Sequence, residues 1–274
     1  MTADDVPDGL ALCRESGWNQ TEADWRMLLH PPSVFRAAVV DGHVVGSAGA
    51  MVYGDALAWV CMVLVAKALR GQGLGTRLVE EVLERLPAVG AVGLDATPKG
   101  QPVYERLGFV PTASLARHLV TSTRARVQPP GEGARRLTED DLVRILPRDE
   151  ATFGADRARA LRHAWTSAPE YAWCVGASEA TPAYAFGRHG ANAEHIGPVV
   201  ADSEAAAATV VRACIEGNPG RTFILDAPDW PGWRRTLADM GFHEQRPFTR
   251  MFRAGRSPGG HPEKAYAAFG PELG

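Results

Sequence analysis

Apolar residues gather in short runs along the chain, and the runs are separated by turn residues or by segments with helical periodicity. Two such runs lie in residues 34–52 and flank Asp41-Gly42, a dipeptide typical of a tight β-hairpin turn. Residues 56–65 (ALAWVCMVLV) are apolar throughout, which predicts a strand with both faces buried at the centre of a sheet. A helix is predicted over 75–86, because its apolar residues form one stripe: Leu78, Val79, Val82, Leu83 and Leu86.

The second half of the chain repeats the order of elements found in the first. Residues 94–109 can be laid on residues 225–242 with two residues added, and both segments run from Leu-Asp-Ala through a loop and a helix to Gly-Phe. In both halves an apolar strand and a helix precede this segment. The pattern predicts tandem copies of one α/β unit, with domains over 1–125 and 135–274 and a linker over 126–134 that contains two prolines and two glycines.

Three glycines and an arginine stand where the predicted central strand turns into the next helix, in the segment ALRGQGLGTR. A helix N-terminus offers unpaired backbone N–H groups and a partial positive charge, and glycine lets a large anion approach the main chain. Arg70 can add charge-assisted hydrogen bonds, so residues 70–76 are interpreted as a phosphate cradle. A Walker loop would need lysine after Gly75, and a dinucleotide-binding fingerprint would need a third glycine at Thr76. A turn that only packs the helix closely against the strand is the alternative.

The segment Arg70-Gly71-Gln72-Gly73-Leu74-Gly75 resembles the acyl-CoA motif Arg/Gln-x-x-Gly-x-Gly/Ala of the GCN5-related N-acetyltransferases (GNAT). Residues 103–109 (VYERLGF) are similar to the closing motif of that superfamily, at the expected distance downstream. This resemblance covers residues 10–122, and the second half, through FGADR and RPFTRMF, resembles the C-terminal domain of bacterial tandem acetyltransferases. It implies a mixed α/β fold, with a mostly antiparallel central sheet flanked by helices, and transfer of an acetyl group from acetyl-CoA without a metal.

In enzymes of this kind the central strand splays from its neighbour, and the pantetheine arm of the coenzyme lies in the gap. Backbone groups of Leu64 and Val65 would bond this arm, and the main-chain N–H groups of residues 71–76 would hold the pyrophosphate. Thr97 stands where the family often has asparagine, and its hydroxyl can still bond the pantetheine. The predicted coenzyme-binding residues are Leu64, Val65, Arg70, Gly71, Gln72, Gly73, Leu74, Gly75, Thr76 and Thr97.

Tyr104 corresponds to the usual general acid of the family, which protonates the departing thiolate of coenzyme A. A phenol with a pKa of about 10 stays protonated at neutral pH and can donate to a basic sulfur, while packing under the sheet is the alternative role. The general base of the family is often a glutamate on the central strand, and none occurs between Ala56 and Val65. The base is then water, Asp95 or another group, and a structural role is favoured for Asp95.

The acceptor pocket of the family is shaped by the first two helices and by the loop between them, here residues 15–25. Trp18, Asn19 and Gln20 combine an aromatic wall with amide donors and acceptors, as a site for a polar small molecule requires. Packing of the helix pair is an equal alternative for Trp18 and is favoured for Trp25.

The second half lacks the cradle, because the corresponding helix start, ADSEAAAATVV, contains neither arginine nor glycine. Leu237 stands at the position that matches Tyr104. We therefore expect the second half to bind no acyl-CoA, to complete the acceptor cleft and to extend the sheet. Arg157, Arg246 and Arg250 could bind an acidic group of the acceptor, although salt bridges are favoured for each.

The composition is that of a globular protein and narrows the choice of partners. The 274 residues are 45% hydrophobic and carry a net charge of −3, which argues against nucleic acid or an anionic membrane as the main partner. The longest apolar run, of about ten residues, is too short to cross a bilayer, and the acidic start lacks the features of a signal peptide. The four cysteines are far apart without a Cys-x-x-Cys pair, as expected of reduced thiols in a cytoplasmic protein.

We expect an acyl-CoA-dependent N-acyltransferase that moves an acetyl group to the amine of a small molecule by direct attack in a ternary complex. Two alternatives stay open: a protein of this fold that takes its acyl group from an acyl-carrier protein, and a sensor that binds coenzyme A or a metabolite without catalysis. The acceptor, the acyl chain length and the oligomeric state are open too. So is the first strand of the family fold, since only two residues precede ADDVPDGLAL.

Overall fold

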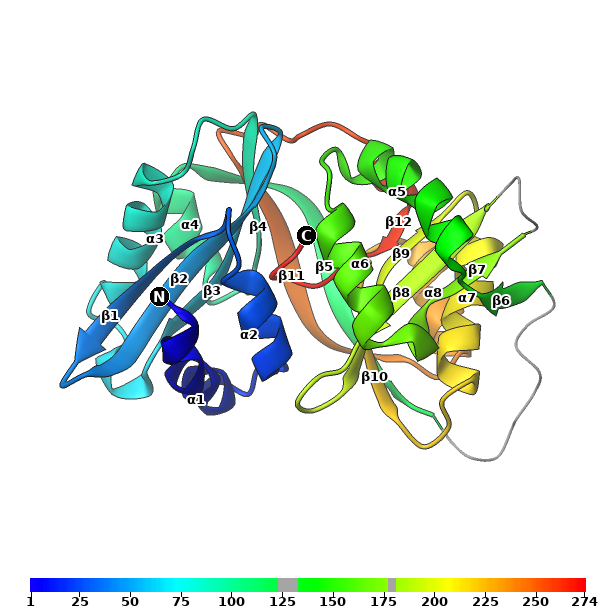
Figure 1. The fold of residues 1–274 in the computed structure, drawn as a ribbon, viewed down its shortest axis with the longest axis horizontal. Coiled ribbons are helices and arrows are strands. Elements are labelled where there is room, and N and C mark those ends of the chain that lie inside the picture. Colours follow the sequence, from blue (N-terminus) through cyan, green and yellow to red (C-terminus); the bar gives the residue numbers. More distant parts are fainter. Residues whose placement is uncertain (123–132, 177–180) are drawn as a thin grey trace.

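The computed structural model describes residues 1–122, 133–176 and 181–274, and its strands join into one twelve-stranded sheet (Figure 1). The strands of the first half are β1 (Val34–Val40), β2 (His43–Tyr53), β3 (Leu57–Val65), β4 (Ala91–Ala96) and β5 (Phe109–Thr121). Those of the second half are β6 (Ala134–Arg136), β7 (Trp173–Val175), β8 (Ala183–Arg188), β9 (Glu194–Ala201), β10 (Thr222–Pro228), β11 (His243–Arg253) and β12 (Ala265–Ala267).

Helices cover both faces of this sheet. The α-helices of the first half are α1 (Val6–Ser16), α2 (Glu22–Leu28), α3 (Leu74–Glu84) and α4 (Gln101–Arg106). Those of the second half are α5 (Glu139–Phe153), α6 (Ala158–Ser167), α7 (Glu204–Glu216) and α8 (Pro231–Asp239). Single 3-10 turns occur at Ala3–Asp5, Lys67–Leu69, Pro169–Tyr171 and Pro262–Lys264.

The strands follow the order β1-β2-β3-β4-β11-β5-β10-β9-β8-β7-β6, and β12 lies off this path and pairs with β9. Two neighbouring pairs, β3–β4 and β9–β10, are parallel, and the others are antiparallel. The predicted mixed, mostly antiparallel sheet flanked by helices is confirmed.

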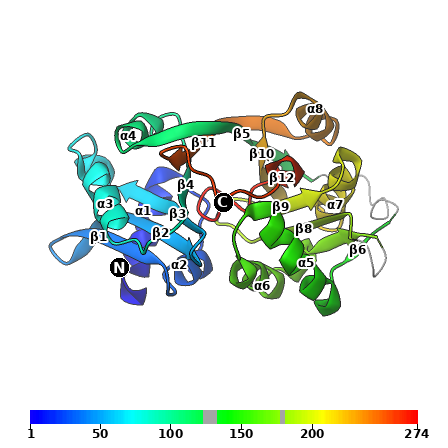
Figure 2. The ribbon, with the colours of Figure 1, turned by 90° about the horizontal axis from the view of Figure 1, so that it is seen from above.

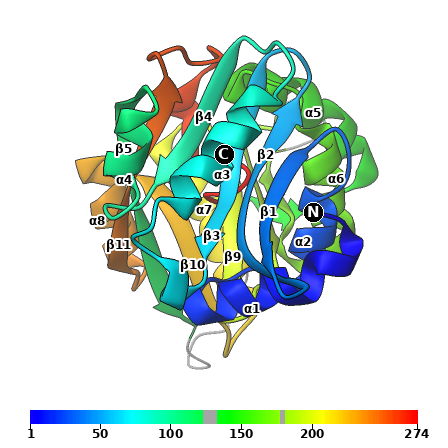
Figure 3. The same cartoon turned by 90° about the vertical axis from the view of Figure 1, so that its left-hand side faces the viewer.

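Local sequence signals in the first half lead to the expected elements. The turn between β1 and β2 is Asp41-Gly42, and both residues take positive φ angles, of 49° and 83°, as a tight hairpin turn requires. Helix α3 occupies nearly the predicted range and lies across one face of the sheet (Figure 3). Its stripe of Leu78, Val79 and Val82 is buried in one apolar cluster with alanines of β2 and Val60 of β3.

The two long strands β5 and β11 are exchanged between the halves. β11 belongs to the second half of the chain but pairs with β4, and β5 belongs to the first half but pairs with β10. β5 and β11 also pair with each other and bridge the two halves, as Figure 2 shows from above. The predicted boundary therefore separates the halves along the sequence but not in space. Residues 126–132 of the predicted linker lie outside the described residues, and Ala134 already begins β6.

Two ion pairs repeat across the exchanged strands. Arg117 of β5 donates two hydrogen bonds of 2.7 Å to Asp226 of β10. Arg250 of β11 donates two of 2.9 Å to Asp95 of β4. Each aspartate is the central residue of one Leu-Asp-Ala copy, so the repeat in the sequence sets the same bidentate pair in each half. The structural role favoured for Asp95 is thus observed.

The two halves differ at the outer edges of the sheet. The second half has β6 before its first two helices, whereas the first half opens with α1 and α2, and the edge of the sheet there is β1. All four cysteines are buried as free thiols. None of the helices in the described ranges is both long and apolar enough to span a membrane.

Candidate active site

The parallel strands β3 and β4 pair over a short stretch and then diverge. Residues 57–59 lie opposite residues 91–93. Beyond this point β4 pairs with β11, while β3 continues along β2 and contains a bulge in which Met62 has a φ of 51°. The gap expected beside the central strand is therefore present.

Six consecutive amides at the start of α3 face no acceptor among the described residues. The N–H of Arg70 bonds Lys67 O and the N–H of Arg77 bonds Gly73 O, but the N–H groups of residues 71–76 donate to no acceptor in the described part of the chain. The first four N–H groups of any helix lack partners within the helix, and here two more precede them. Together with the helix dipole they form a site suited to a phosphate or pyrophosphate.

The three positions of the cradle require glycine for different reasons. Gly71 and Gly73 have φ angles of 80° and 78°, which L side chains rarely adopt, and a Cβ on either would meet no atom within 4 Å. At Gly75 neither backbone conformation nor crowding requires glycine. Its φ is not in the left-handed region, and a Cβ there would lie 3.5 Å from Val65 Cγ2, an ordinary contact distance. Packing within the protein does not require glycine at 75, whereas a ligand held against the helix N-terminus would.

Arg70 holds the loop instead of pointing freely toward the cradle. Its Nε donates to Val65 O at 2.8 Å, and its Nη2 donates to Ser16 Oγ at 3.0 Å and lies 4.0 Å from Glu15. The guanidinium thus ties the end of β3 to the end of α1, and its predicted contact with a phosphate stays a prediction. Gln72 is exposed, and Leu74 packs against the core.

The backbone N–H and C=O groups of Leu64 and Val65 point in opposite directions along β3. The N–H of Ala66 bonds Val45 O, which makes Val65 and Gly46 a non-hydrogen-bonded pair of the β2–β3 ladder. The N–H and C=O of Val65 therefore point away from β2, toward the gap, and those of Leu64 point toward Ser47. Of the two residues predicted to bond the pantetheine arm, Val65 has the required orientation and Leu64 does not.

A cavity of about 50 Å³ lies in the gap and is lined by both halves of the chain. Tyr104 of α4 lines it half-buried, with its ring 6.1 Å from that of Phe109. Burial raises the pKa of the Tyr104 phenol, so this group stays protonated well above neutral pH. Thr97 lines the same cavity, and its Oγ1 accepts a bond of 3.2 Å from the N–H of Gly100 while its own proton stays free for another acceptor.

The acceptor-loop residues divide into two roles. Trp18, Asn19 and Gln20 all line the cavity, as predicted. The side chain of Asn19, however, is committed to the second half: its Nδ2 donates to Ala193 O, and its Oδ1 accepts from the N–H groups of Asn192 and Ala193. Asn19 therefore joins the two halves, and its predicted binding of an acceptor stays a prediction.

Gln20 has a side-chain atom available to a ligand, whereas Trp25 packs in the core. Oε1 of Gln20 is buried and has no hydrogen-bond partner within residues 1–122, 133–176 and 181–274, so it is available to a ligand. Trp25 is fully buried in the core, as favoured from the sequence.

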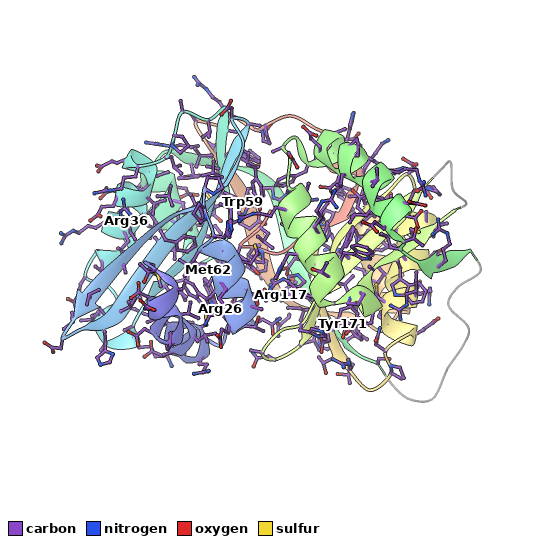
Figure 4. All side chains as sticks on the ribbon, viewed as in Figure 1. Arg26, Arg36, Trp59, Met62, Arg117 and Tyr171 are labelled. Carbon is purple, nitrogen blue, oxygen red and sulfur yellow. The ribbon has the colours of Figure 1, made fainter. Side chains whose placement is uncertain are left out.

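The second half supplies four residues to the cavity, Arg246, Phe248, Pro271 and Glu272, and Arg117 lines it beside them. Arg117 belongs to the first half by sequence but lies on the exchanged strand, where the two halves meet (Figure 4). Arg246 lies over the ring of Phe248 at 4.9 Å. Glu272 reaches the cavity from the C-terminal tail, which is anchored by bonds from Trp59 Nε1 to Pro271 O and from Tyr53 to Leu273 O. No signal in the sequence pointed to Glu272.

A buried ionic network supports this wall of the cavity. Arg188 of β8 donates to Asp24, at 2.8 Å, and to Glu272 Oε1. Asp226 binds Arg117 and also lies 3.2 Å from His195 Nε2. Burial lowers the pKa of His195, so the imidazole is neutral at pH 7 and adds no charge.

The equivalent gap in the second half is occupied by the chain itself. β9 and β10 pair through residues 194–196 and then diverge, and β12 runs along β9 in this space, so close that a Cβ on Gly197 would lie 2.0 Å from Ala268 O. At the start of α7 the Ser203 side chain accepts the N–H of Ala206. Leu237 is fully buried. Neither an open gap nor a free glycine cradle is present in this part of the described chain.

Comparison with known proteins places each half in the same family. Residues 7–109 match the acetyltransferase (GNAT) family, and residues 145–267 match an acetyltransferase (GNAT) domain. The chain is 25% identical to the protein named uncharacterized N-acetyltransferase YitH of Bacillus subtilis (strain 168), over 97% of this chain and 94% of that protein. It is 27% identical to a holothin acyltransferase of Pseudoalteromonas sp. (strain SANK 73390), over 88% and 81%.

The fold also matches a solved structure over its whole length. The crystal structure of a putative acetyltransferase from Pyrococcus horikoshii superimposes with a TM-score of 0.81, at 20% identity, and covers 100% of this chain and 94% of that one.

Proposed function

Because the chain belongs to the GNAT family of acetyltransferases and carries two such domains in tandem, we propose that its first half transfers an acetyl group from acetyl-CoA to the amine of a small molecule. Acyl-CoA-dependent N-acyl transfer is the general activity of this family. The proposal assigns that activity to the first half and makes the second half a wall of the acceptor site.

The observation that carries the proposal is the row of six unpaired amides of residues 71–76, beside the gap in the sheet. Such a row suits a diphosphate, and the gap leads from it to the cavity that holds Tyr104. A coenzyme bound in this way would have its main-chain contacts at the cradle and at Val65, and its thioester beside the acceptor loop.

Acetyl-CoA supplies the acetyl group as a thioester: a C–N bond to the acceptor forms, the C–S bond breaks, and the electron pair of that bond goes to sulfur. Tyr104 then donates its phenolic proton to the sulfur, and the nitrogen of the new amide loses a proton, which restores the phenol. Its raised pKa keeps that proton in place until the thiolate appears, and the same burial raises the basicity of a thiolate beside it. The backbone N–H of Val65 points into the gap and is positioned for the carbonyl oxygen or the pantetheine arm.

The size of the cavity supports an acetyl group over a longer acyl chain. Its volume of about 50 Å³ holds only a few water-sized groups, which suits a short acyl group beside a small acceptor. Trp18 and Met62 close its sides.

The second half is proposed to bind no coenzyme, because β12 fills its gap and Ser203 caps its helix. The carboxylates of Asp202 and Glu204 also flank that helix start, where they would repel a phosphate.

Gly73→Glu is expected to weaken acetyl-CoA binding about a hundredfold in a calorimetric titration, since losing two charge-assisted hydrogen bonds costs about 3 kcal/mol. The new carboxylate lies at the helix N-terminus and competes with the diphosphate. Gly220→Glu is the matched control, because Gly220 has a φ of 83° and equally open surroundings but lies outside the cradle. Wild-type protein that fails to bind acetyl-CoA, or that binds it without releasing thiol with any amine of a broad panel, would refute the proposed function.

A further inference from the structure

Three polar side chains of the active-site cavity have atoms that the protein leaves without partners. Oε1 of Gln20, Oε2 of Glu272 and Nε of Arg246 are buried and form no hydrogen bond within the described residues. Buried polar atoms are nearly always paired in folded proteins, and an unpaired one costs about 1–3 kcal/mol. All three residues line the same cavity, so one ligand can satisfy them together.

Two of these atoms are hydrogen-bond acceptors. The Glu272 side chain is 97% buried, since only 3% of it is exposed. Arg188 holds its Oε1, which leaves Oε2 as the atom available to a ligand. Gln20 adds a second acceptor oxygen from the loop between α1 and α2. Two acceptors, one of them charged, match the N–H groups of a primary amine or ammonium.

The third atom belongs to a cation that has no counter-ion in the described part of the protein. Arg117 is neutralised by Asp226, and Arg250 by Asp95, but Arg246 has no carboxylate within salt-bridge distance among these residues. Its guanidinium lies over Phe248, which orients the fork without using its donors. Burial and the nearby charge of Arg117 lower the pKa of Arg246, and the charges of Asp226 and Glu272 offset this only in part.

Arg246, Phe248 and Arg250 alternate along β11 and therefore share one face of the sheet. Arg250 lies over the ring of Trp59, which belongs to the core between the halves, so this face is turned away from α3 and its cradle. The free cation thus lies on the acceptor side of the gap. A phosphate of the coenzyme held at residues 71–76 would lie on the opposite side.

We propose that the acceptor is a small amino acid-like zwitterion, whose carboxylate is bound by Arg246 and whose amine is received by Glu272 and Gln20. The inference rests on the proposed function and names its substrate class. Glu272 Oε2 takes one proton from the ammonium, and the freed nitrogen pair forms the C–N bond to the acetyl carbon as the C–S bond breaks. Tyr104 gives its proton to the sulfur, the nitrogen of the new amide loses its second proton to the Tyr104 phenolate, and Glu272 releases its proton to solvent. A carboxylate suits Arg246, because guanidinium binds it bidentately and the cavity is small.

The test measures binding without turnover. Purified full-length protein, saturated with coenzyme A, is titrated calorimetrically with α-, β- and ω-amino acids, each paired with the amine that lacks its carboxylate. At least one acid is expected to bind about a hundredfold more tightly than its paired amine. Arg246→Gln is expected to remove that preference, and Arg246→Lys to keep part of it. Arg253→Gln, at the exposed end of the same strand, is the control and should change nothing.

The result that would overturn the inference is an equal affinity for acid and amine throughout the panel, or a preference that survives Arg246→Gln. This failure is distinct from failure of the proposed function, which is read from acetyl-CoA binding and thiol release.

Glu272→Gln can still accept the bond from Arg188, so the fold is preserved. It is expected to lower kcat about a hundredfold while the affinity for acetyl-CoA is unchanged, and an unchanged kcat would remove Glu272 from the proposal.

Discussion

Replacing Tyr104 with phenylalanine is expected to lower kcat between about a hundredfold and ten-thousandfold, the range typical of a positioned general acid. The ring and its contact with Phe109 remain, so only the proton donor is lost. Acetyl-CoA should bind Tyr104→Phe as it binds the wild type, because the cradle and Val65 are untouched. Calorimetry for binding and thiol release under saturating substrates separate the two effects. Because burial raises the pKa of Tyr104, the wild-type rate should show no loss from this group up to its ordinary pKa of about 10.

Tyr266→Phe is a suitable control for this experiment. Tyr266 lies in the second half against Trp230 and Trp233, far along the chain from α4, and its hydroxyl is not part of the cavity. A kcat that falls equally in both variants would show that the loss reflects the fold. A kcat that falls in neither would return Tyr104 to the packing role that was its alternative.

Removing the carboxylate of Asp226 is expected to lower the free energy of unfolding by about 3–5 kcal/mol, the usual cost of leaving a buried charge unpaired. Arg117 and Asp226 have side chains that are 7% and 2% exposed, and their pair joins the exchanged strand β5 to β10. Burial alone would raise the pKa of Asp226, but the charge and hydrogen bonds of Arg117 outweigh this effect, and the pKa is lowered. Urea unfolding of Asp226→Ala and wild type measures the difference at pH 7.

The pH dependence of that difference has a definite sign. Because the pKa of Asp226 is lowered in the folded state, its contribution is complete above the unfolded value of about 3.9 and is lost as the pH falls further. The exposed pair Arg26–Glu22 is the control, and Glu22→Ala should cost less than about 0.5 kcal/mol. The double variant Arg117→Met with Asp226→Leu should regain much of the loss. An Asp226→Ala protein with unchanged stability would contradict the part assigned to the exchanged strands.

Features that depend on residues close together in the sequence were predictable. The hairpin at Asp41-Gly42, the buried strand before the glycines and the helix after them follow from turn chemistry and periodicity, and the structure has all three. The cradle was predicted as well, because a row of free amides is a local property of one helix start. What the sequence did not reveal there is the position of the Arg70 side chain, which is set by Val65 and by Ser16 of another helix.

Features that depend on distant segments were not predictable from residue pattern. From the sequence Asn19 is predicted to bind the acceptor, but its hydrogen-bond partners Asn192 and Ala193 lie more than 170 residues further along the chain. The exchange of β5 and β11 depends on pairing between strands from different halves of the chain, which the residue pattern of one strand does not specify. Leu-Asp-Ala signalled a repeat, and the arginines that bind the two aspartates cross between the halves.

The role of the C-terminal tail was the least predictable from the sequence. The segment that ends in PELG has no periodicity or motif, yet it carries Glu272 into the cavity of the first half. Shortly before, β12 fills the corresponding gap of the second half. The C-terminal tail thus fills the gap in the second half and adds Glu272 to the cavity in the first. These two roles could be found only from the folded chain.

The central claim is that the amides of residues 71–76 hold the diphosphate of the coenzyme. It is tested most directly by recording backbone amide NMR resonances of the isotope-labelled protein during titration with acetyl-CoA. The account predicts large, saturable shifts at these six amides and at Val65, with none at the start of α7, residues 204–208. Saturation with acetyl-CoA that leaves the six amides unmoved, or that moves the amides of α7 instead, would contradict it.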